Sequence, residues 1–63
     1  MIYTIERRCE FGGGEMKSHY EVRSYERRTK IGVLVDGRTL KRAKTKVEAK
    51  DYCGRNGIAY EEL

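Results

Sequence analysis

The sequence predicts an α+β fold in which a three- to four-stranded antiparallel sheet packs one face against a single C-terminal helix. Three observations support this prediction: alternating polar and apolar residues in the first half of the chain, an Asp-Gly dipeptide between two strand-like runs, and a capping motif followed by a helical apolar stripe. The expected order is β-β-β-β-α, and the last residues can add a short C-terminal strand. Because the chain has 63 residues, we expect one domain, residues 1–63, with a thin core.

The first strand is predicted over residues 1–11, where polar and apolar residues alternate and β-branched and aromatic side chains are frequent. Its inner face is expected to carry Tyr3, Ile5, Cys9 and Phe11. The glycines at 12–14 then end the strand and are expected to form a flexible hairpin loop. Although Lys17-Ser18 follows this loop, the spacing differs from that of a phosphate-binding loop and a strand is expected next.

A second strand is predicted over residues 18–25, with Tyr20 and Val22 directed inward. The side chains expected on its outer face are His19, Glu21 and Arg23. The polar connection over residues 26–29 has no Gly or Pro, so its boundaries are not defined by the sequence.

The clearest hairpin signal is Asp36-Gly37, which lies between the strand-like runs 30–35 and 38–43. A type I′ turn needs positive φ at both central residues, and Asp-Gly is typical of this turn. The two-residue loop fixes a register in which Val35 faces Arg38, Val33 faces Leu40 and Ile31 faces Arg42. The core side is then expected to hold Ile31, Val33, Val35 and Leu40, with Arg38 and Arg42 reaching its rims. The flatter, more basic side is expected to hold Lys30, Gly32, Leu34, Thr39, Lys41 and Ala43.

The helix start is predicted at Thr45-Lys46-Val47-Glu48, which has the form of a capping box. The side chains expected on its buried stripe are Ala49, Tyr52, Cys53 and Asn56, whereas Val47 lies off the stripe and is expected to be partly exposed. Asn56-Gly57 supplies a C-terminal stop, with Gly57 in the left-handed region and Ile58 folding back. Residues 58–63 are expected to form a short edge strand or an ordered tail.

Positive charge is concentrated between Arg23 and Lys46. This stretch carries nine basic residues and two acids, a sum of +7, whereas the rest of the chain sums to −3. A basic hairpin beside a helix suits a polyanion, although a charge run of this kind is also typical of a solvated surface. The candidate nucleic-acid-binding residues are cations that can project from the sheet face opposite the helix or from its adjacent turn, with two side chains that can stack or hydrogen-bond. They are Arg23, Arg27, Arg28, Lys30, Lys41, Lys44, His19 and Tyr25.

Catalytic and metal sites are not expected. No residue set specifies a reaction, and a chain of this length is not expected to enclose a deep, dry pocket. One His and two cysteines 44 positions apart are too few for a zinc site, so we expect no metal and no cofactor. No apolar run approaches the ~20 residues that cross a membrane, and no signal peptide is recognisable. We therefore expect a cytoplasmic protein with reduced thiols, in which Cys53 is a core side chain.

Residues 38–52, RTLKRAKTKVEAKDY, resemble the last strand and helix start of the AP2-like N-terminal DNA-binding domains of tyrosine recombinases, the integrases of phages and transposons. Residues 45–49 match the T-K-x-E-A pattern that opens the helix in that family. The resemblance implies a three-stranded sheet packed on one C-terminal helix, with the sheet inserted into the major groove of DNA. It also implies that Arg23, Lys30 and Lys41 are candidate DNA contacts.

These features together predict a small non-catalytic nucleic-acid-binding domain that uses a basic β-hairpin face, encoded by a phage or mobile element. We expect DNA to be the ligand rather than RNA. A protein-interaction module, such as a small phage inhibitor that binds a host protein through the same basic patch, remains the alternative. Exposed sheet edges can also pair with a partner strand or with a second copy in a homodimer.

Overall fold

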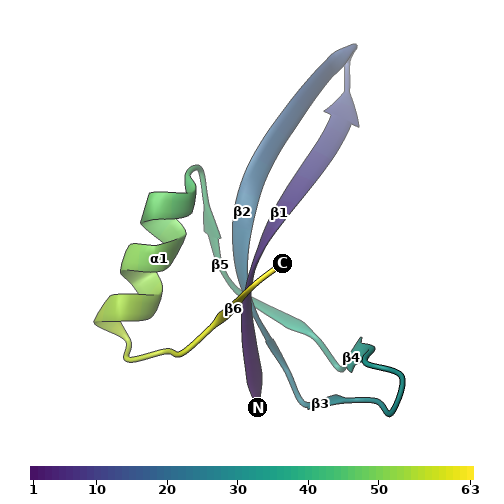
Figure 1. The fold of residues 1–63 in the computed structure, drawn as a ribbon. Coiled ribbons are helices and arrows are strands. Elements are labelled where there is room, and N and C mark those ends of the chain that lie inside the picture. Colours follow the sequence, from purple (N-terminus) through teal and green to yellow (C-terminus); the bar gives the residue numbers. More distant parts are fainter.

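The computed structural model describes all 63 residues and contains a mixed four-stranded sheet with one helix on one face (Figure 1). Strands β1 (Ile2–Gly12) and β2 (Glu15–Tyr25) form a long antiparallel hairpin, and β5 (Arg38–Ala43) pairs antiparallel with β2. The C-terminal strand β6 (Glu61–Glu62) pairs parallel with β1, which gives the order β5-β2-β1-β6. The α+β class is therefore confirmed, but the sheet is mixed where an antiparallel one was expected.

The hairpin between β1 and β2 turns through the tight loop Gly13-Gly14. Both glycines have positive φ, 60° and 78°, which is the requirement of a type I′ turn. The strands pair up to Gly12 opposite Glu15, so the loop contains two residues. This turn fixes the register of the whole hairpin, including the directly opposed pair Ile5 and Val22.

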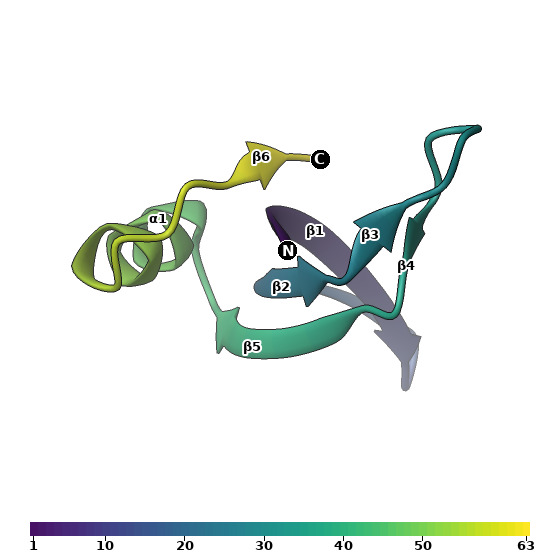
Figure 2. The ribbon, with the colours of Figure 1, turned by 90° about the horizontal axis from the view of Figure 1, so that it is seen from below.

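The chain between β2 and β5 leaves the sheet and forms a separate small hairpin, in which β3 (Arg27–Arg28) pairs with β4 (Leu34–Val35) (Figure 2). The predicted pairing of residues 30–35 with 38–43 is therefore wrong. Asp36 adopts a positive φ of 56°, but Gly37 does not, so Asp-Gly forms no type I′ turn. Ile31 and Val33, which were expected in the core, are 86% and 49% exposed in this hairpin.

A bulge in β5 at Leu40 reverses the faces predicted for the second half of that strand, whereas Arg38 and Thr39 keep theirs. Lys41 lies opposite Val22 on the helix-covered face, and Arg42 lies opposite Glu21 on the other face. Ala43, expected on the basic side, is buried. Because side chains alternate along a strand, one extra residue in the bulge is enough to exchange the faces of all residues after it. Leu40, at the bulge between these pairs, is 38% exposed rather than buried.

The core lies between the sheet and α1 (Lys46–Arg55) and is small. Its buried apolar residues are Ile5, Val22, Ala43, Ala49 and Cys53. Tyr20, Tyr52, Ile58 and Tyr60 pack around it, partly exposed. Cys9 and Phe11, predicted on the inner face of the first strand, are exposed because the β1–β2 hairpin extends beyond the helix (Figure 1).

The ends of α1 follow the predicted capping chemistry. The Thr45 hydroxyl accepts a hydrogen bond from the Glu48 N–H at 3.2 Å, and the Glu48 carboxylate accepts one from the Lys44 N–H at 3.1 Å. At the other end Gly57 has a φ of 64°, and the Ile58 N–H donates to the Cys53 carbonyl at 2.9 Å.

The exposure of two side chains in the helix region can be compared with the predicted buried stripe. Val47 is 77% exposed, as its position off the stripe predicted. Asn56 was expected on the buried stripe but is exposed at the C-cap, where its amide donates to the Tyr52 carbonyl. No helix in the structure is both long and apolar enough to cross a membrane.

Candidate nucleic-acid interface

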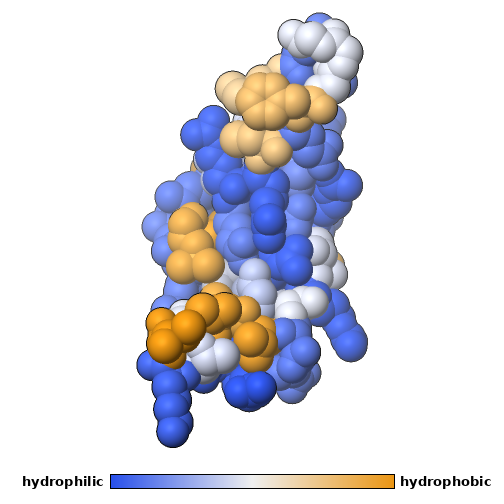
Figure 3. Space-filling model, turned by 90° about the vertical axis from the view of Figure 1, so that its right-hand side faces the viewer, coloured by the Kyte–Doolittle hydropathy of each residue, from blue (hydrophilic) through white to orange (hydrophobic).

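The sheet face turned away from α1, here called the open face, is lined by charged and polar side chains. Cross-strand pairing brings together Thr4 with Arg23, Glu6 with Glu21, Arg8 with His19 and Glu10 with Lys17. Figure 3 views the molecule from the side away from the helix, and hydrophilic surface covers the middle of this view. The outer strand β5 adds Thr39 and Arg42 to the same face.

The direct opposition of Glu6 and Glu21 needs compensation, because like charges opposite each other destabilise a sheet. Glu21 accepts hydrogen bonds from His19 Nε2 at 2.7 Å and from Arg23 Nη1 and the Thr39 hydroxyl at 3.0 Å. The bond from His19, followed by those from Arg23 and Thr39, outweighs burial and lowers the pKa of Glu21 to about 2. The Glu21 side chain, only 12% exposed, is therefore held ionised.

The second carboxylate, Glu6, is bonded as fully. It accepts from the Thr4 hydroxyl at 2.8 Å, the Tyr25 hydroxyl at 2.5 Å and Arg8 Nη2 at 3.1 Å. Burial, together with the bond to Glu6, raises the pKa of Tyr25. The Arg23 guanidinium lies over the Tyr25 ring, 5.6 Å from its centroid. The open face therefore carries a connected polar network with fixed side-chain positions.

Gly37 packs directly against this network. A Cβ at that position would lie 2.5 Å from Tyr25 Cε1 and 3.1 Å from Arg23 Nη2. The absence of a side chain therefore allows the backbone before β5 to approach the Tyr25 ring.

The structure brings three of the eight candidate residues into the network: His19, Arg23 and Tyr25. Each of them has a polar atom bonded to Glu21 or Glu6, so their orientations are set before any ligand binds, although Arg23 Nε is buried without a hydrogen-bond partner. Arg28 is also paired, through two bonds of 2.9 and 2.7 Å to Glu61.

The other four candidates make no ion pair but occupy different places. Arg27 and Lys30 are exposed on the β3–β4 hairpin. Lys44 is exposed between β5 and α1. Lys41 is separated from the others, because it lies on the helix side in a shallow depression lined by Lys41, Glu48, Asp51, Tyr52 and Arg55. The prediction that Lys41 projects from the face opposite the helix is wrong, because the bulge in β5 places Lys41 opposite Val22 on the helix side.

Arg8, Lys17 and Arg42 lie on the open face but were not among the predicted site residues. Arg42 Nη2 contacts Glu10 Oε1 at 3.2 Å, and both side chains are more than 60% exposed. Alternation along the strands was the available signal for Arg8 and Lys17, because it places Arg8 on the face opposite Ile5 and Lys17 on the face opposite Val22. Arg42 had no such signal, since its face depends on the bulge in β5 at Leu40.

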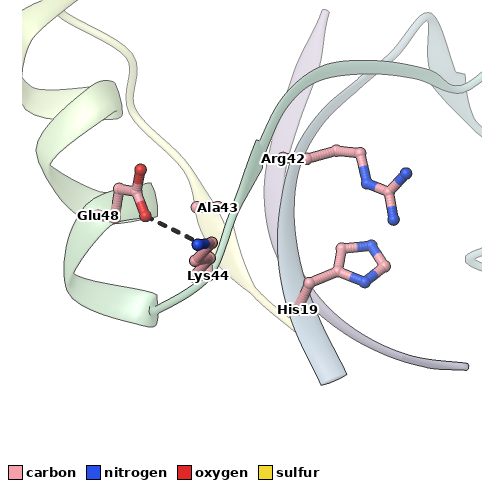
Figure 4. A pocket seen from close by; sticks show the side chains of 5 residues that line it. All are labelled: His19, Arg42, Ala43, Lys44 and Glu48. Atoms are coloured by element: carbon pink, nitrogen blue, oxygen red, sulfur yellow. Dashed lines mark hydrogen bonds between the residues drawn. The ribbon is translucent and has the colours of Figure 1, made fainter. Parts of the chain in front are cut away.

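A pocket of about 490 Å³ lies at the end of β5, beside the start of α1 (Figure 4). It is lined by His19, Arg42, Ala43, Lys44 and Glu48. Three of these side chains carry nitrogen donors and one is a carboxylate, so the lining is predominantly basic.

The two cysteines are free thiols in different surroundings. Cys9 is exposed on the β1–β2 hairpin, whereas burial raises the pKa of Cys53 in the core. No group of three or more His, Cys, Asp and Glu side chains is placed to hold a metal ion.

Comparisons of this chain with protein-family models, with curated proteins and with solved structures give no match.

Proposed function

We propose that this chain is a small nucleic-acid-binding domain that binds duplex DNA through the open face and the β3–β4 hairpin. The observation that carries the proposal is a surplus of unpaired cations. Of the 14 Lys and Arg side chains, half make no ion pair: Arg7, Lys17, Arg27, Lys30, Arg38, Lys41 and Lys44. Fewer acids are unpaired, namely Glu15, Glu26, Asp36 and Glu48.

Several of these cations border the open face. Lys17 lies on the β1–β2 hairpin, Arg27 and Lys30 on the β3–β4 hairpin, and Lys44 beside the pocket. A charged surface of this kind attracts phosphates without reading sequence, whereas the ordered network between them, with Tyr25 packed beneath Arg23, can present His19 to the ligand. The molecule measures 38 × 29 × 15 Å, and a two-stranded ribbon such as β1–β2 fits the major groove.

The test is binding to a random duplex of about 20 base pairs and to a random single strand, by fluorescence anisotropy, at about 50 and 200 mM salt. With four phosphate contacts, affinity for the duplex is expected to fall roughly 100-fold between these concentrations. The variant Lys17→Gln/Arg27→Gln/Lys30→Gln is expected to bind at least tenfold more weakly, with a shallower salt dependence.

The matched control is Lys46→Gln/Lys50→Gln/Arg55→Gln, which removes three positive charges from the helix side, where all three are paired with acids. This variant should keep most of the duplex affinity. Absence of binding at the lower salt concentration, or equal loss in both variants, contradicts the proposed interface.

A protein-interaction module is the second candidate, and exposed apolar side chains favour it. Phe11 and Met16 form a cross-strand pair near the β1–β2 turn and are 82% and 61% exposed, and Ile31 on the other hairpin is 86% exposed. Figure 3 shows apolar surface towards both ends of this view, with mostly hydrophilic surface between apart from an apolar patch at its left edge. Exposed apolar patches often mark protein contacts.

The double variant Phe11→Ser/Ile31→Ser separates the two candidates. If the chain docks on a protein through these tips, a partner retained from nuclease-treated lysate by the wild type is lost by the variant. If the chain is a nucleic-acid-binding domain, the variant keeps its affinity for the duplex.

A further inference from the structure

The pocket at the end of β5 gathers cationic side chains from different parts of the chain. His19 comes from β2, Arg42 from the last part of β5, and Lys44 from the segment that leads to α1. Figure 4 shows Arg42 and His19 side by side on one side of β5, with Glu48 on the other. The N-terminus of α1, whose first turn carries Glu48, adds partial positive charge to the same region.

The acids near the pocket are engaged and leave the cations available. The Glu48 carboxylate accepts the Lys44 N–H at 3.1 Å and belongs to the helix cap. Glu21 is held by His19, Arg23 and Thr39 on the open face.

Arg42 has a single weak partner. Its 3.2 Å contact with Glu10 joins side chains that are 62% and 64% exposed, and a surface pair of this kind contributes little. A phosphate can replace Glu10, because a guanidinium donates two parallel hydrogen bonds to phosphate oxygens.

His19 forms one wall of the pocket, and its ring is held in a fixed orientation. Its Nε2 lies 2.7 Å from Glu21, and because that carboxylate is ionised, Nε2–H donates and Glu21 accepts. The ring is therefore fixed beside Arg42, with Nδ1 as the remaining polar atom. Lys44 has no ion pair and is exposed, so its ammonium is free to reach a bound anion.

We propose that this pocket binds a phosphate group, with Arg42 and Lys44 as the two charged ligands and His19 as the side wall. The inference deepens the proposed function: on that function, the group is one phosphodiester of the nucleic-acid backbone. The chemistry is shared with free phosphate, so the test has separate arms for the two sources.

The first arm uses inorganic phosphate as the probe and amide NMR of the whole chain, titrated against sodium chloride at equal ionic strength. Saturable shifts at the amides of Ala43, Lys44 and Glu48 are expected in the millimolar range. The variants Arg42→Gln and Lys44→Gln should each weaken phosphate binding at least fivefold. The control Arg27→Gln/Lys30→Gln, which alters the β3–β4 hairpin, should leave phosphate affinity unchanged.

The variant Glu48→Gln is expected to change phosphate affinity in the opposite direction to Arg42→Gln and Lys44→Gln. The amide oxygen of Gln can still accept the Lys44 N–H, while the negative charge on the pocket wall is removed. Phosphate binding is expected to strengthen severalfold, which a purely structural role of the pocket would not produce. Linear shifts without saturation, or Arg42→Gln binding like the wild type, overturns the proposal.

The second arm repeats the phosphate variants with the random duplex. If the pocket holds a phosphodiester, Arg42→Gln/Lys44→Gln binds the duplex more weakly and releases about two fewer counterions. Saturable phosphate binding with unchanged duplex affinity supports the pocket and overturns the diester as its ligand. Duplex binding without a saturable phosphate response leaves the proposed function standing and overturns the pocket. Phosphate binding in a chain with no affinity for duplex or single strand supports the pocket and overturns the nucleic-acid function.

Discussion

The two faces of the same sheet are ordered by different forces. On one face Ile5, Val22 and Ala43 are almost completely buried under α1. On the other, Glu21 and Arg23 stand on either side of Val22 in sequence and remain 12% and 20% exposed in a hydrogen-bonded network. The first face is stabilised by removal of apolar surface from water, and the second by directed bonds between charged groups.

This difference matters for what each face can do. Apolar packing is non-directional, so it tolerates repacking but needs a cover, which α1 supplies. The polar network needs no cover, because Glu6 and Glu21 already have partners for their charges. Where no helix covers it, a face with fixed side chains can meet a ligand, although the backbone at Gly37 packs against part of it; the helix-covered face cannot.

The largest effect is expected from truncation on the apolar face. Ile5→Ala removes a side chain that is 2% exposed, and such a change costs about 2–5 kcal/mol. Because a domain of this size has a free energy of unfolding of only a few kcal/mol, most of the variant should be unfolded at room temperature. Circular dichroism during urea unfolding measures this directly. The control Val47→Ala, at a 77% exposed position, should change stability by less than about 0.5 kcal/mol. A cost below about 1 kcal/mol for Ile5→Ala would show that the polar face stabilises the sheet more.

The next effect concerns the polar face and depends on pH. The pKa of Glu21 falls from 4.5 to about 2 on folding, so ionised Glu21 stabilises the folded chain above pH 4.5. This contribution, at most roughly 3 kcal/mol, is lost as the pH falls from 4.5 towards 2. Unfolding by urea across this window should show the loss in the wild type and a much shallower slope in Glu21→Gln. Glu15→Gln, at an exposed and unpaired position, should follow the wild type, and equal slopes in all three would remove Glu21 as the cause.

Local signals predicted the parts of the fold that are decided within a few residues. The Thr45 cap, the Gly57 stop and the alternation of residues 18–25 were all confirmed, because each depends on contacts inside its own segment. Asp36-Gly37 is also a local signal, but there the tertiary structure prevails. Pairing with β2 brings Ala43 into the core beside Tyr20, and Gly37 fits against the Tyr25 ring.

The candidate site shows the same difference between residues placed by local signals and residues placed by tertiary structure. His19, Arg23 and Tyr25 were correctly placed together, since alternation along β2 fixes their shared face whichever strand lies beside them. Lys41 and Arg42 were exchanged, because a bulge at Leu40, which no local pattern signals, shifts the alternation of β5. The acids that form ion pairs with the basic residues were not predictable either. Glu61, for example, lies 33 positions after Arg28 in the sequence and pairs with it only through the fold.

A smaller effect on stability is expected at Gly37, where the backbone between β4 and β5 packs against the polar face. Gly37→Ala places a Cβ 2.5 Å from Tyr25 Cε1, so the Tyr25 ring must move and its bond to Glu6 weakens. Overpacking of this kind costs about 1–3 kcal/mol. Gly54→Ala is the control: nothing lies within 4 Å of its added Cβ, and alanine in a helix gains about 0.5–1 kcal/mol over glycine. Thermal unfolding of the two variants should therefore shift in opposite directions. Equal shifts would mean that Gly37 does not support the network.

The smallest effect is expected for the ion pair between Arg28 on β3 and Glu61 on β6. Both hydrogen bonds are short, 2.9 and 2.7 Å, but the two side chains are 44% and 51% exposed, so water screens the pair. A double-mutant cycle with Arg28→Gln and Glu61→Gln should give a coupling energy of about 0.2–1 kcal/mol that decreases with added salt. The Glu21–Arg23 pair, which is largely buried, should show a larger coupling with weaker salt dependence when measured in the same way. If the exposed pair couples as strongly as the buried one, the order of the polar face does not come from its partial burial. The ion pairs at the edges of the sheet would then contribute as much to its stability as the network at its centre.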